Sequence, residues 1–100
     1  MNFNLSTPND LTLLIAAKAK EKRLFFNFTQ QTLSERSGVS FGVIKKFERT
    51  GKISLESLLK IALVLDSLAE FSALFTAKPL ESYSTLDQLL KQKKRKRGRK

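Results

Sequence analysis

The stretch TQQTLSERSGVSFGVIKKFER, residues 29–49, decides the fold of this 100-residue chain. It predicts two short helices, over about 30–37 and 41–49, because Thr29 and Ser40 stand where a helix start needs a capping hydroxyl. Gly38 follows the first helix at the position where a left-handed residue ends a helix. Two short helices joined by a turn with one glycine are typical of a helix-turn-helix.

Apolar residues recur at helical spacing in this stretch, and we expect Leu33, Val39, Ile44 and Phe47 to be buried. The two helices must pack on each other and on the helix before them, which requires apolar side chains at these positions. The outward positions of the second helix are then free to contact a partner. They are Ser40, Phe41, Gly42, Lys45, Lys46 and Arg49.

The flanking sequence also predicts helices. Thr7-Pro8-Asn9-Asp10 is typical of a helix start and opens a first helix over about 8–22, with Leu11, Leu14, Ile15 and Ala19 inward. Ser54 opens a fourth helix rich in leucine. Ser67-x-x-Glu70 is a capping box before a fifth helix with Phe71, Leu74 and Phe75, and Thr85-x-x-Gln88 is a second box before a short helix with Leu86, Leu89 and Leu90.

Charge is concentrated at one end of the chain. Lysine and arginine number 19 and acidic residues 9, for a net charge of +10. Eight of the basic residues lie in 91–100, KQKKRKRGRK, so residues 1–90 carry a net charge of only +2. A block of like charges repels itself, and we expect this tail to be disordered without a polyanionic partner.

Composition excludes most catalytic and metal sites. Without cysteine or histidine, the chain has no disulfide, no thiolate or imidazole metal site and no Ser-His-Asp arrangement. The nine acidic residues are scattered, and the four glycines form no phosphate-binding loop. We therefore expect no enzyme, metal or cofactor. No apolar run is long enough to span a membrane and no secretory signal is present, which favours a cytoplasmic protein with no membrane role.

The stretch resembles the lambda-repressor/Cro-like helix-turn-helix family. The resemblance covers roughly residues 8–75 and rests on Thr29-Gln30, Leu33, Ser37-Gly38-Val39-Ser40, Ile44, Glu48, Gly51, Ser54-Leu55, Leu58 and Ile61-Ala62. Within that family, KKFERTGKISLESLLKIALVLD followed by a Lys/Arg-rich end is similar to HipB-like regulators. Those regulators are antitoxins paired with HipA-like kinase toxins.

The resemblance implies a role for each matching residue. Gln30, beside Thr29 at a helix N-terminus, would bind a DNA phosphate, and Arg23 would form an internal ion pair with Glu48. The remaining DNA-binding positions are Ser40, Phe41 and Lys45 at base edges in the major groove, with Gly42 between them, and Lys46, Arg49 and Lys52 at phosphates or flanking bases.

Phe41 and Gly42 depart from the family, whose members often have polar residues here. A phenyl ring has no hydrogen-bonding group, although it can contact a thymine methyl group; the alternative is that Phe41 folds back on the core or into a protein contact. The basic residues of this helix also have an alternative role, as an ordinary solvated face.

Partner contacts are expected at the C-terminal end. Leu68, Phe71, Leu74 and Phe75 either form a homodimer interface on a palindromic operator or belong to the core. The helix from Thr85 to Leu90 packs back on the body or docks on a partner. The tail binds DNA phosphates through Lys93, Lys94, Arg95, Lys96, Arg97 and Arg99, docks on an acidic protein, or only solubilises the chain.

The sequence thus predicts an all-α chain: a five-helix lambda-repressor-like DNA-binding domain, a short extra C-terminal helix and a disordered basic tail. The predicted boundaries are 1–76, 77–91 and 92–100. The predicted function is sequence-specific transcriptional regulation of double-stranded DNA, as an autorepressor and as the antitoxin of a HipA-like kinase toxin. The alternative is a protein-interaction module that mainly binds or helps to neutralise the kinase, with DNA binding secondary.

Overall fold

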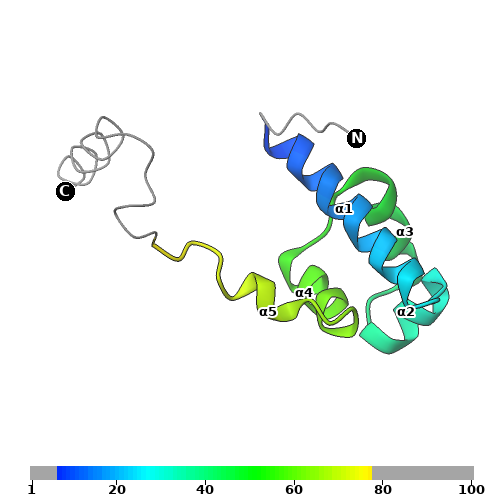
Figure 1. The fold of residues 1–100 in the computed structure, drawn as a ribbon. Helices are drawn as coiled ribbons and strands as arrows, with labels where there is room; N and C mark the ends of the chain where they lie inside the picture. The colour runs from blue at the N-terminus through cyan, green and yellow to red at the C-terminus, as the bar shows by residue number, and fades with distance from the viewer. Residues whose placement is uncertain (1–6, 78–100) are drawn as a thin grey trace, which may run out of the picture.

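The computed structural model describes residues 7–77, which form five α-helices (Figure 1). They are α1 (Pro8–Phe25), α2 (Gln30–Ser37), α3 (Phe41–Thr50), α4 (Leu55–Val64) and α5 (Leu68–Phe71). The all-helical, five-helix prediction is therefore confirmed for this part of the chain. The predicted helix from Thr85 and the basic tail lie outside the described residues. None of the helices within 7–77 has the length and apolar character needed to cross a membrane.

Hydroxyl side chains cap the starts of four helices, as the sequence predicts. The oxygens of Thr7, Thr29, Ser40 and Ser54 each accept a hydrogen bond from the backbone N–H three residues later, at 2.9–3.2 Å. Gly38 and Gly51 end α2 and α3 with φ of 79°. Each of these signals acts within a single turn, which is why the bounds of α2 agree with the predicted range and α3 gains only one residue.

The core lies where α1, α2, α3 and α4 meet. Leu33, Ile44, Phe47 and Ile61 are its largest fully buried side chains. The long helix α1 lies alongside α3 (Figure 1). Their approach is close at Gly51, where a Cβ atom would lie 3.0 Å from the backbone of Thr12. The tight fit fixes how α3 is presented on the body.

The first helix is longer than predicted, whereas its predicted inner face is confirmed at Ile15 and Ala19, which pack against the core. It continues to Phe25 rather than ending near Lys22, and Leu11, predicted inside, is 45% exposed. The buried residues of α1 are Ala16 and Arg23. Apolar residues occur all round this helix, so the pattern alone placed Leu11 on the inner face and did not single out Ala16. A small alanine lets the core residues of other helices come close to α1.

The fifth helix also needs correction. Ser67 does not cap α5 with its side chain; its oxygen accepts from Lys22 Nζ at 2.8 Å and its hydroxyl donates to the Leu65 carbonyl at 3.2 Å. A contact across the fold has replaced the local capping box. The helix ends at Phe71, so Leu74 and Phe75 lie beyond it in consecutive turns closed by hydrogen bonds between residues three apart.

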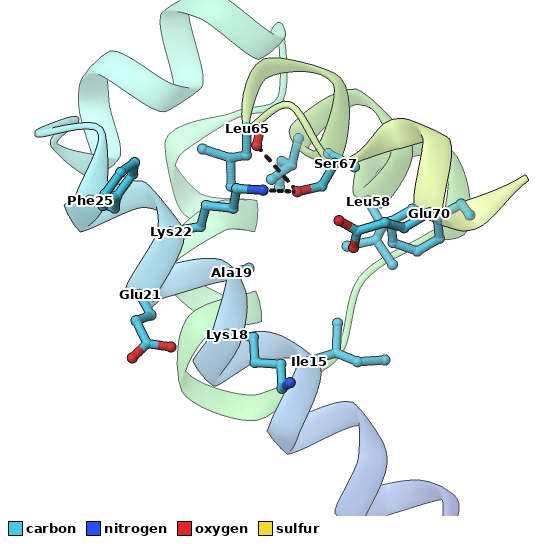
Figure 2. A pocket seen from close by; sticks show the side chains of 13 residues that line it. Ile15, Lys18, Ala19, Glu21, Lys22, Phe25, Leu58, Leu65, Ser67 and Glu70 are labelled. Carbon is cyan, nitrogen blue, oxygen red and sulfur yellow. Dashed lines mark hydrogen bonds between the residues drawn. The ribbon is translucent and has the colours of Figure 1, made fainter.

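A groove of about 510 Å³ lies between α1 and the α4–α5 segment (Figure 2). Figure 2 shows Lys22 reaching across from α1 to Ser67, next to Leu65. Ile15, Ala19, Leu58 and Phe71 contribute apolar surface to its lining. The bond between Lys22 and Ser67 ties the start of α5 to α1.

Candidate nucleic-acid interface

The third helix has one buried and one exposed face. Ile44 and Phe47 are 0% and 2% exposed and hold α3 on the body. The predicted contact residues lie on the other side or at the cap, and all are exposed: Ser40, Phe41, Gly42, Lys45, Lys46 and Arg49. The structure therefore leaves these side chains available to a partner, and Phe41, at 41% exposed, is not folded into the core.

The exposed face is cationic. Lys45, Lys46, Arg49 and the nearby Lys52 form no salt bridge with any acidic residue of 7–77. The one acidic residue of α3, Glu48, has its side chain only 7% exposed. The Glu48 carboxylate is therefore absent from the surface on which the basic side chains lie. That surface is positively charged and complementary to a polyanion.

An ion pair inside the fold anchors this helix. Arg23 Nε donates to Glu48 Oε2 at 2.7 Å, and Arg23 Nη2 donates to Glu48 Oε1 at 3.0 Å. The third donor, Nη1, reaches the Phe28 carbonyl at 2.8 Å. The structure places this pair inside the fold, where the family resemblance predicts it. It joins the end of α1 and the connection to α2 to the last turn of α3.

Gln30 belongs to the same network, which the sequence did not predict. Its Nε2 donates to Glu48 Oε1 at 2.9 Å. Gln30 and Thr29 lie at the start of α2, where the first backbone N–H groups of the helix have no partner within it. The structure thus holds the side-chain amide of Gln30 against α3, while its place at the helix N-terminus is as predicted.

The turn between α2 and α3 is held by short polar contacts. Ser34 donates its hydroxyl to the Val39 carbonyl at 2.6 Å, and the Val39 N–H donates to Ser37 Oγ at 3.1 Å. Val39 itself is 4% exposed, as predicted. With Gly38 in the left-handed conformation, these contacts fix the angle between the two helices.

Comparison with known families agrees with this geometry. A family model described as helix-turn-helix matches residues 20–71, just over half of the chain. The chain belongs to the helix-turn-helix family. The match supports the lambda-repressor/Cro-like type, whose domains bind DNA and are not catalytic. A search of curated proteins finds no match.

The helix-turn-helix has a further contact on its exposed face. Lys45 Nζ lies 5.6 Å from the centre of the Phe41 ring, within the range of a cation–π interaction. The two residues are four apart on α3 and so share one side of it. That spacing was visible in the sequence and could have predicted the pair.

The expected interface at the end of the described chain is mostly exposed. Leu68 and Leu74 are 38% and 57% exposed, Phe75 is fully exposed, and Phe71 is partly buried where it lines the groove. Phe75 also has a positive φ of 64°. Three of the four residues are thus not core. The predicted phosphate-binding residues of the tail lie outside the described part of the chain.

Proposed function

We propose that this DNA-binding regulator is a sequence-specific repressor that acts by occupying a palindromic operator, including one that controls its own expression. The exposed cationic face of α3 carries the proposal. Its opposite face is core, the fold braces it through Arg23 and Glu48, and the one acidic side chain of the helix is buried. A helix held in this way enters the major groove as a rigid element.

The roles of the residues follow from their places. Ser40, Phe41 and Lys45, with Gly42 between them, meet base edges, because the N-terminal residues of a recognition helix lie deepest in the groove. Lys46, Arg49 and Lys52 bind phosphates or flanking bases. Thr29 and Gln30 offer a phosphate the N-terminus of α2, where free backbone N–H groups favour an anion.

A second copy of the chain completes the operator contact. Exposed apolar side chains at the end of the described chain, Leu68, Leu74 and Phe75 beside Phe71, supply surface that a homodimer would bury. In this arrangement residues 1–76 form the DNA-binding domain, 77–91 connect it to the tail, and 92–100 are a basic segment that adds phosphate contacts. The net charge of +10 supports the last role.

The antitoxin role is a second proposal and rests on the resemblance to HipB-like regulators. The exposed side chains Leu24 and Phe25, at the end of α1, support a protein partner besides DNA. A HipA-like kinase encoded beside this chain, and co-purifying with it, is the expected result. An isolated gene whose product binds no kinase would contradict the antitoxin role and leave the repressor role standing.

The repressor proposal is tested by fluorescence anisotropy with the DNA upstream of the chain's own reading frame. The full chain should bind this fragment more tightly than a scrambled fragment of equal composition. The variant Lys45→Ala/Lys46→Ala should lose at least about tenfold in affinity, because several phosphate and base contacts disappear. Lys60→Ala, on α4, is the control and should bind like wild type. Equal binding of native and scrambled fragments would contradict the proposal.

A further inference from the structure

The start of α3 combines three unusual features. A large apolar side chain, Phe41, stands at the first helical position and is 41% exposed. The ammonium group of Lys45 lies over its ring, 5.6 Å from the ring centre. Gly42, between them in sequence, has no side chain. We infer that these three residues form one reading unit, which recognises a thymine methyl group and a guanine one or two base pairs away.

The inference rests on the proposed DNA-binding function and names the bases that the helix reads. A phenyl ring cannot hydrogen-bond a base edge, and the thymine C5-methyl is the apolar group that the major groove offers. A lysine ammonium donates hydrogen bonds to O6 and N7 of guanine, which are both acceptors. An aromatic ring and an ammonium held together therefore match a thymine and a guanine.

The distance between the two groups limits how far apart the bases lie. Successive bases along one strand are about 3.4 Å apart along the helix axis. The 5.6 Å between the ammonium and the ring centre lies between one and two such steps. The cation–π contact also restricts the lysine side chain, so that the ammonium and the ring reach the groove as a pair.

Gly42 is not required by the fold. A Cβ atom there would meet nothing within 4 Å, and unlike Gly38 and Gly51 this glycine has no positive φ. Alanine would favour the helix more than glycine does. The missing side chain instead leaves open space at this position, on the exposed side of the helix start. We assign that space to the approaching edge of the DNA.

The test begins with the duplex that the full chain enriches from a random library. Each thymine is replaced in turn by deoxyuridine, which lacks only the methyl group, and each guanine by 7-deazaguanine, which lacks N7. At one thymine, deoxyuridine should lower wild-type affinity about fourfold, the equivalent of about 0.8 kcal/mol for one buried methylene-sized group. At a guanine one or two base pairs away, 7-deazaguanine should lower it severalfold.

Variants assign each effect to a residue. Phe41→Ala should bind thymine and deoxyuridine duplexes equally, and Lys45→Ala should bind guanine and 7-deazaguanine duplexes equally. Lys52→Ala is the matched control: it should weaken binding to all duplexes by the same factor and keep both ratios. Gly42→Ala should melt at or above the wild-type temperature and yet bind more weakly. Thermal melts of Phe41→Ala and Lys45→Ala check that both remain folded.

Several results would overturn the inference. These are an enriched site insensitive to every deoxyuridine, a deoxyuridine effect that persists in Phe41→Ala, or Gly42→Ala binding like wild type. Failure of the proposed function looks different, because the library would then yield no shared sequence at all. A Lys45→Ala variant that weakens all duplexes equally would place Lys45 on a phosphate and remove guanine from the reading unit.

Discussion

Replacing Arg23 by alanine should unfold this small domain at a much lower temperature. The guanidinium makes three hydrogen bonds, two to Glu48 and one to the Phe28 carbonyl, at 2.7–3.0 Å. The side chains of Arg23 and Glu48 are only 8% and 7% exposed, so water does not replace the lost partner. Removing one member of a buried pair costs about 3–5 kcal/mol, against about 0–1 kcal/mol for a surface pair.

Thermal unfolding followed by circular dichroism at a helix wavelength measures this loss. At about 4–8 °C per kcal/mol for a domain of 60–100 residues, the melting temperature should fall by at least about 12 °C. Arg23→Lys keeps the charge but loses the two-pronged geometry, so it should fall between the wild type and Arg23→Ala.

A paired replacement separates the buried charge from the packing. Arg23→Met/Glu48→Leu removes both charges and retains apolar volume, so it should recover part of the stability that Arg23→Ala loses, although the Phe28 carbonyl and the Gln30 amide lose their partners. A loss of less than about 1 kcal/mol in Arg23→Ala, the value of an exposed pair, would show that the pair does not act as a buried one. A double variant as unstable as the single one would show the same.

Three further predictions concern turns, the DNA-binding face and the tail. Gly38→Ala should lower the free energy of unfolding by about 1–2 kcal/mol, because alanine is strained in the left-handed conformation. Gly51→Ala should lower it clearly more in urea unfolding, because its Cβ would also lie 3.0 Å from the backbone of α1; equal losses would contradict the close packing. Lys45→Ala/Lys46→Ala should shift the melting temperature by no more than about 2–4 °C, since both side chains are exposed, and a larger shift would give them a structural role. Neutralising the basic residues of 91–100 should flatten the dependence of DNA affinity on salt, measured by titration at several salt concentrations, and leave the preferred site unchanged; a changed site would mean that the tail reads bases.

Local signals in the sequence predicted much of the fold. The caps at Thr29 and Ser40 and the glycines at 38 and 51 act through bonds within one turn. The neighbouring sequence is therefore enough to predict where each of these helices starts or ends. Ser67 had an equally good local pattern, yet its hydroxyl bonds Lys22, which is 45 residues away. The sequence next to Ser67 gives no indication of a hydrogen-bond partner so far away in the chain.

The candidate site also has features that local spacing predicts and features that only the packing of the helices determines. The exposed face of α3 was predictable because Ile44 and Phe47 define its buried face by spacing alone. The bond from Gln30 to Glu48 was not, since the angle between α2 and α3 decides whether the two side chains meet. On α1 the sequence correctly placed Ile15 and Ala19 against the core but misplaced Leu11, because apolar residues surround that helix and only packing selects Ala16 over Leu11.

The exposed face of α3 is expected to read a defined DNA sequence as part of a dimer. Selection by the full chain from a random duplex library, at about 150 mM salt to suppress nonspecific phosphate binding, tests it most directly. The wild-type chain should enrich one two-fold symmetric site, which Lys45→Ala/Lys46→Ala should fail to enrich. Retained DNA with no shared sequence would contradict it, and the basic residues would then be a generic phosphate-binding surface.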